Sequence, residues 1–127
     1  MEILLVSAEP SRYAQALAPF ARRGASLASA PTLQEGLSAI KASLPSPPAL
    51  VILDEGEDRA GDQALRQAVM QIIKASAFTY VCAISSRPAE TLHDAMEGLG
   101  MLPPLPANPT EADGEHLLQQ LSRFVPV

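Results

Sequence analysis

Ala49-Leu50-Val51-Ile52-Leu53-Asp54 is the most strand-like stretch of this 127-residue sequence. Its five consecutive apolar residues show no polar alternation, which predicts a strand covered on both faces, as in the centre of a parallel sheet between helices. A second apolar run, Thr79–Ile84, predicts another central strand. The first run ends in Asp54, so this carboxylate is expected at the carboxyl end of a buried strand.

Strand-like and helix-like segments alternate along the whole sequence. Three further stretches predict strands, namely Glu2–Val6, the weaker Ala25–Ala30 and the proline-containing Met101–Pro106. Each predicted strand is followed by apolar residues at helical spacing. This alternation predicts an α/β fold with right-handed crossovers and a parallel sheet that has helices on both faces. We expect one domain over residues 1–127.

Prolines and caps refine these boundaries. Pro19 falls inside the first predicted helix, where it removes one backbone hydrogen bond, so we expect a kink or an early end there. Thr32 and Glu35 have the spacing of a capping box at a helix start. Met101–Pro106 contains three prolines, which cannot donate to a ladder and are tolerated only at a sheet edge. The fifth strand is therefore expected at an edge.

Composition excludes several classes of function. A net charge of -5 and 4% aromatic residues, with no Trp, argue against direct binding of nucleic acid. The apolar stretch Ile3–Val6 is too short for a signal peptide or a membrane span, so we predict a cytoplasmic protein without membrane association. Cys82 is the only cysteine, which excludes an intrachain disulfide, and its apolar strand predicts a buried, inert thiol.

Two segments resemble the receiver (CheY-like) domains of response regulators in two-component signalling. Met1–Pro10 resembles the opening strand of that family, which normally ends in two acids followed by Glu-Pro or something close to it. Ala49–Asp54 resembles the third strand, which ends in the phospho-accepting aspartate. The resemblance spans nearly the whole chain. It implies a flavodoxin-like (βα)5 three-layer sandwich with a five-stranded parallel sheet of order 2-1-3-4-5, and it makes Asp54 the phosphoacceptor-like residue.

The resemblance also identifies the positions that hold a metal ion in this family. Two acids after the first strand normally bind Mg²⁺, which neutralises charge during phosphoryl transfer. Ser7 and Ala8 stand in their place, followed by Glu9. We therefore predict no metal site and no cofactor, apart from a weak Mg²⁺ site between Glu9 and Asp54.

The remaining positions of the family's pocket are also altered. Ser85 matches the switch hydroxyl that hydrogen-bonds the phosphoryl group, although a helix-capping role fits it equally well. Asn108 stands where the family has a lysine before a proline. The loop Glu55–Gly61 is acidic through Glu57 and Asp58, so little positive charge offsets a phosphoaspartate. We expect Asp54 to hydrogen-bond the loop amides that follow it.

The leading hypothesis is a degenerate receiver, or pseudo-receiver, that acts as a phosphorylation-independent interaction module in bacterial signalling. In receivers, the fourth helix, fifth strand and fifth helix carry dimer or partner contacts; by resemblance these are Ala89–Leu99, Met101–Pro106 and Thr110–Phe124. A working receiver that is phosphorylated on Asp54 is the alternative. A flavin-binding or small-ligand domain is a weaker one, because Ser7–Ser11 lacks the glycines of a phosphate-cradling loop.

An enzyme is not expected. Ser7, Asp54 and Ser85 follow three different strands and together are reminiscent of a hydrolase site. Both histidines, His93 and His116, fall on predicted helices instead, where surface positions are the usual outcome.

Overall fold

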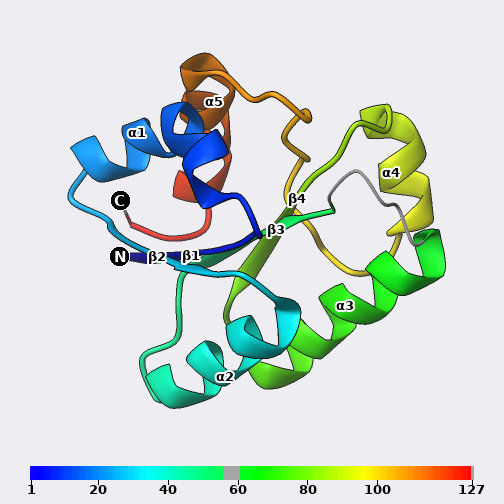
Figure 1. Ribbon diagram of the computed structural model, residues 1–127, viewed down its shortest axis with the longest axis horizontal. Helices are drawn as coiled ribbons and strands as arrows, with labels where there is room; N and C mark the ends of the chain where they lie inside the picture. The colour runs from blue at the N-terminus through cyan, green and yellow to red at the C-terminus, as the bar shows by residue number, and fades with distance from the viewer. Residues whose placement is uncertain (56–60, 127) are drawn as a thin grey trace.

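A computed structural model, which describes residues 1–55 and 61–126, shows the predicted alternation of strands and helices (Figure 1). The strands are β1 (Glu2–Val6), β2 (Ser26–Ala30), β3 (Leu50–Asp54) and β4 (Tyr80–Ile84). The helices are α1 (Ala14–Arg22), which follows a 3-10 turn η1 (Pro10–Tyr13), and α2 (Leu33–Ser43), α3 (Asp62–Ala75), α4 (Ala89–Ala95) and α5 (Glu111–Ser122). Among the described residues, no helix combines the length and the apolar content needed to cross a membrane.

The sheet is parallel and has the order β2-β1-β3-β4, which confirms the predicted order for its first four strands. The expected fifth strand is reduced to one parallel bridge between Ile84 and Leu105. Leu105 donates its amide to the Ala83 carbonyl at 2.9 Å, but the prolines of Met101–Pro106 have no N–H with which to extend the ladder. The predicted fifth segment does lie at the edge of the sheet, next to β4, but it forms a single bridge and not a strand. Among the described residues, the sheet of this flavodoxin-like fold has four strands.

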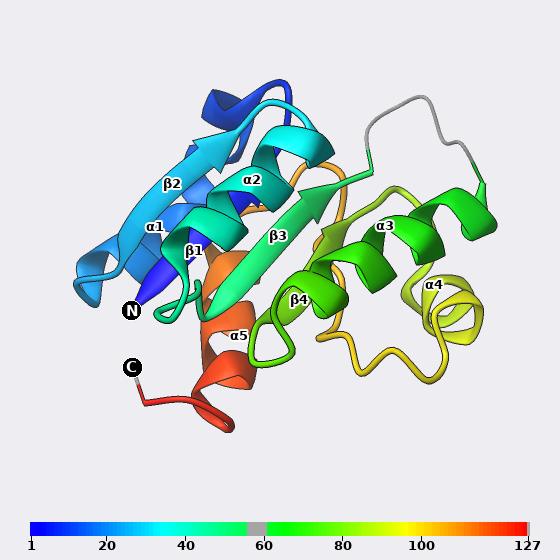
Figure 2. The ribbon, with the colours of Figure 1, turned by 90° about the horizontal axis from the view of Figure 1, so that it is seen from below.

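Helices cover both faces of the sheet, as the apolar runs predict. Figures 1 and 2 show α1 and α5 on one face and α2 and α3 on the other, with α4 beside α3. Successive residues of β3 point to opposite faces: Leu50 and Ile52 pack in the cluster with α1 and α5, whereas Val51 and Leu53 pack in the cluster with α2, α3 and α4. All four are 6% exposed or less, which confirms burial on both faces.

The first helix does not end early. α1 continues through Pro19 to Arg22, because Pro19 and Phe20 are buried and their packing offsets the hydrogen bond that the proline removes. α5 lies very close to α1: a Cβ atom at Gly114 would be 2.0 Å from the carbonyl oxygen of Ala16. The residues immediately before α1 lie near the carboxyl end of β1, because η1 follows that strand directly in the chain.

Two helix starts are capped by threonine. Thr32 accepts a hydrogen bond from the Glu35 amide at 3.2 Å, as its position predicts. Thr110 and Asp113 form a complete capping box at the start of α5, in which each side chain bonds the other residue's amide. The capping box anchors the loop that carries Asn108 onto the amino end of α5.

Candidate functional site

The candidate site lies at the carboxyl ends of the strands. Ser7 follows β1, Asp54 ends β3 and Ser85 follows β4, so three of the predicted residues lie along one edge of the sheet, where open α/β sheets usually bind ligands. The contacts divide these residues into two separate groups, one built around Asp54 and one built around Glu55.

Asp54 is held by two hydroxyl groups. Ser7 Oγ and Tyr13 Oη each donate to the same carboxylate oxygen, Oδ2, at 2.8 Å. Both donors are buried, at 4% and 3% exposure, and Ser7 Oγ also accepts the Glu9 amide at 3.0 Å. The carboxylate is thus bound to the β1–α1 side of the molecule. The loop amides predicted to bond it belong mostly to residues 56–60, outside the described residues.

Tyr13 was not among the predicted site residues. Its place in the apolar stripe of the first helix predicts burial, which is correct, but a buried tyrosine hydroxyl also needs a partner, and that signal points to a nearby acceptor. Burial, and then the hydrogen bond to Asp54 and its charge, raise the pKa of Tyr13 to about 12. Tyr13 therefore remains a neutral donor at physiological pH.

The residues at the metal position do not fit Mg²⁺. Ser7 stands where the family has an acid and donates a hydrogen bond to Asp54, and Ala8 has no ligand atom in its side chain. The Glu9 carboxylate lies 3.5 Å from Arg12 Nη1, an ion pair that competes with a cation. Within the described part of the chain, no three His, Cys, Asp or Glu residues are grouped to hold a metal ion. We derive no chemical step through Mg²⁺.

Arg12 brings positive charge to the position of the family's lysine. Its Nη2 atom donates to Asn108 Oδ1 at 3.0 Å, and its guanidinium carbon lies 5.9 Å from the centre of the Tyr13 ring. The sequence did not predict this contact, because Arg12 and Asn108 are 96 residues apart. The expectation of little compensating charge did not consider Arg12, which contacts Asn108 and the Tyr13 ring and pairs with Glu9.

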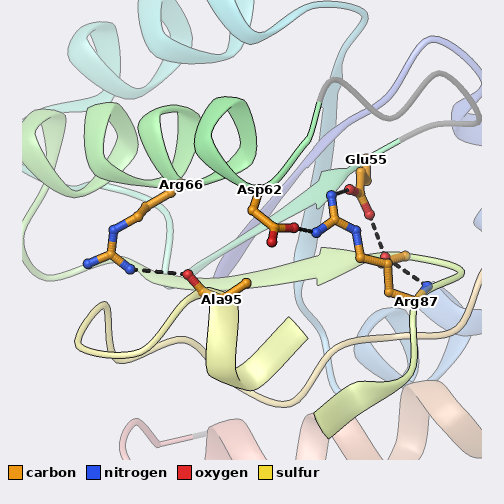
Figure 3. A network of polar contacts seen from close by, with 6 residues as sticks. Glu55, Asp62, Arg66, Arg87 and Ala95 are labelled. Atoms are coloured by element: carbon orange, nitrogen blue, oxygen red, sulfur yellow. Dashed lines mark hydrogen bonds and ion pairs between the residues drawn. The ribbon is translucent and has the colours of Figure 1, made fainter. Parts of the chain in front are cut away.

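Ser85 belongs to the second group, around Glu55. Its hydroxyl donates to the Glu55 carboxylate and accepts the Arg87 amide at 3.1 Å. The Arg87 guanidinium pairs with Glu55 and also with Asp62 at the start of α3 (Figure 3). The side chains of Arg87 and Glu55 are only 7% and 5% exposed. Ser85 does not cap α4, because this helix begins at Ala89 with Pro88 at the N-cap position.

The other predicted residues lie as follows. Cys82 is completely buried, which confirms the predicted burial, and burial raises its pKa to about 12; its inertness stays a prediction. His93 and His116 are exposed on α4 and α5, as the sequence predicts. Glu57 and Asp58 lie outside the described residues.

Searches of the sequence against protein-family models and against curated proteins gave no match. The fold does match. A two-component response regulator from Clostridium difficile superposes with a TM-score of 0.76 over 100% of this chain and 99% of its own, at 10% identity. The chain has the receiver fold.

Two further structures share this fold. A CheY-like protein (tadZ) from Pseudomonas aeruginosa has a TM-score of 0.70 and 14% identity, with coverage of 100% of this chain and 97% of that protein. A putative pilus assembly-related protein from Burkholderia pseudomallei has a TM-score of 0.72 and 18% identity, with coverage of 97% and 90%. At such identities the likeness is one of fold, and the function rests on the site.

Proposed function

We propose that this receiver-fold domain is a signalling module that acts through protein contacts, without enzymatic activity and without phosphorylation of Asp54. The observation that carries the proposal is the pair of buried hydroxyls, from Ser7 and Tyr13, that donate to Asp54 Oδ2. These hydroxyls bind the carboxylate from the β1–α1 side, where the acids of the receiver family hold their metal ion.

Phosphoryl transfer needs positive charge to stabilise the transferred group, but the donors to Asp54 Oδ2 are neutral hydroxyls, and Arg12, beside Asn108, is paired with Glu9. To bond phosphorus through Oδ2, Asp54 would also have to release both hydrogen bonds. Hydrogen bonds to charged groups contribute about 1.5–3 kcal/mol each, so this release opposes attack through Oδ2 by about 3–6 kcal/mol, whereas attack through Oδ1 would leave both hydrogen bonds in place. The site therefore favours a carboxylate that remains unmodified.

The surface that we assign to partner contact includes α4 and the segment after it. A groove of about 940 Å³ is lined by residues of α4, of the turn 96–98 after it and of the stretch 100–104, among them Leu92, Met96 and Met101. Apolar side chains in a concave surface are typical of protein-binding grooves. We propose that a second copy of the chain or a partner protein in the cytoplasm binds this surface, and that nucleic acid does not bind it.

The test measures phosphate uptake and association in one series. We expect no phosphoryl mass on the protein after incubation with acetyl phosphate and Mg²⁺, by intact mass spectrometry, with Asp54→Asn as the blank. Sedimentation velocity should give the same association with and without the phosphodonor. A phosphoryl mass that appears on the wild type and is lost in Asp54→Asn refutes the proposal.

A working receiver is the second candidate, and one observation favours it. Arg12, held by Asn108, supplies a cation beside the pocket where the family has a lysine. This candidate predicts a phosphoryl mass gain on Asp54 that is lost in Arg12→Ala. The control is Arg23→Ala, which removes an exposed arginine just beyond the end of α1.

A further inference from the structure

Helix α4 is fastened to α3 at both of its ends (Figure 3). Just before its first turn, Arg87 pairs with Asp62 of α3 and with Glu55 at the end of β3. At its last turn, Arg66 of α3 donates to the carbonyl oxygens of Ala95 and Glu97, at 3.3 Å and 3.0 Å. Two arginines therefore hold a helix of only seven residues, which has little stability of its own.

The contacts of Asp54 and Glu55 lead in opposite directions. Asp54 accepts hydrogen bonds from the β1–α1 side, through Ser7 and Tyr13, whereas Glu55 accepts them from Ser85 and Arg87 in the segment that leads into α4. This division follows from the strand, because successive side chains point to opposite faces. Ile52, of the same parity as Asp54, packs in the α1 and α5 cluster, and Leu53, of the same parity as Glu55, packs in the α4 cluster.

The Glu55–Arg87 pair is buried, which makes it hard to replace by water. Removing one partner of a buried ion pair leaves the other charge without compensation, which is strongly unfavourable. The segment from Ser85 to the start of α4 therefore has one strongly preferred position, with its hydroxyl and its arginine both on Glu55. Solvent-exposed Asp62 adds to the pair but does not define it.

We propose that Glu55, and not Asp54, sets the position of α4. The buried Glu55–Arg87 pair and the Arg66 contacts together form a clasp that holds α4, and with it one wall of the 940 Å³ groove, in a single arrangement. This inference rests on the proposed function, since it explains how the partner surface remains formed without any modification of Asp54.

Hydrogen exchange at α4 tests the clasp directly. The amides of Leu92 and Met96 bond the carbonyls of Pro88 and Leu92, at 3.1 Å and 3.0 Å, so their exchange reports opening of α4. In Glu55→Gln we expect both amides to exchange about tenfold faster, while the amides of β1 and β3 change less than about twofold. The matched control is Asp54→Asn, the same chemical change one residue earlier, which should leave both α4 amides within about twofold of wild type.

Two further variants test the clasp even if Glu55→Gln fails to fold. Arg87→Met and Arg66→Met remove the arginine at either end of α4, and each should accelerate the same amides by a similar factor. The clasp is refuted if neither arginine variant accelerates them, or if Asp54→Asn does so as strongly as Glu55→Gln. Phosphorylation of the wild type would refute the proposed function. The exchange measurements test the clasp independently of that result.

Discussion

Tyr13→Phe tests whether the hydroxyl of Tyr13 holds Asp54. The substitution removes one oxygen, which is buried and lies 2.8 Å from Asp54 Oδ2, and leaves the ring in the core. Loss of a hydrogen bond to a charged group lowers stability by about 1.5–3 kcal/mol. We therefore expect the free energy of unfolding at pH 7, measured in urea, to fall by about 2 kcal/mol.

The same contact gives this loss a characteristic pH dependence. The pKa of Tyr13 is raised from 10.0 in the unfolded chain to about 12 in the fold, so the unfolded state loses its proton first as the pH rises. The stability that Tyr13 contributes is complete below pH 10 and is lost as the pH rises toward 12. By pH 11 the wild type should have lost about 1.4 kcal/mol through this residue, which Tyr13→Phe cannot lose.

The assay is urea unfolding of both proteins between pH 7 and pH 11, followed by circular dichroism. The difference between wild type and variant should shrink by about 1.4 kcal/mol over this range, because every other titrating group is common to both proteins. Ser7→Ala is the matched control: it removes the other donor to Asp54, but serine does not titrate, so its cost should be constant. A Tyr13→Phe cost that is below about 0.5 kcal/mol at pH 7, or does not change with pH, contradicts the geometry.

Three further predictions concern packing, charge and reactivity. Gly114→Ala should destabilise the protein by about 3 kcal/mol in urea unfolding, because its Cβ meets the backbone of α1. Gly36→Ala should cost about 1 kcal/mol, because its Cβ is crowded only by a valine methyl group, with the Ala30 side chain at ordinary contact distance. Arg87→Met should cost about 3–5 kcal/mol, and the double variant with Glu55→Leu should recover most of that loss in the same assay. Cys82 should resist a thiol reagent in buffer and react fully in denaturant, because it is completely buried; rapid reaction in buffer would contradict this.

The apolar runs of the central strands were sufficient to predict which strands are covered on both faces, whereas the strand order came from the resemblance to receiver domains. Double-sided burial of Leu50–Leu53 can be inferred from the sequence because an apolar run without alternation, between loop residues, is typical of a parallel strand covered on both faces. The sequence was less informative about Met101–Pro106. Its prolines predict an edge, but whether the remaining amides form a strand or a single bridge depends on how closely this segment follows β4, which is a property of the packed molecule.

The candidate site was predicted only in part, and the missing residues share a physical reason. Asp54, Ser7 and Ser85 were found because the resemblance to receiver domains identifies their positions, and strand ends meet along one edge of a parallel sheet. The partners of these residues could not be found in this way. Tyr13 reaches Asp54 across 41 positions and Arg87 reaches Glu55 across 32, and both lie on segments whose orientation is fixed only when the helices pack.

The parity of β3 connects these findings. A strand that is buried on both faces must deliver its last two side chains to different layers, so the two neighbouring carboxylates at its end cannot serve the same helices. In this chain the layer that receives Asp54 contains two hydroxyl donors, and the layer that receives Glu55 contains the arginine that leads into α4. These contacts are the basis of the proposal that Glu55, rather than Asp54, positions the α4 surface. On that proposal the surface forms without phosphorylation of Asp54.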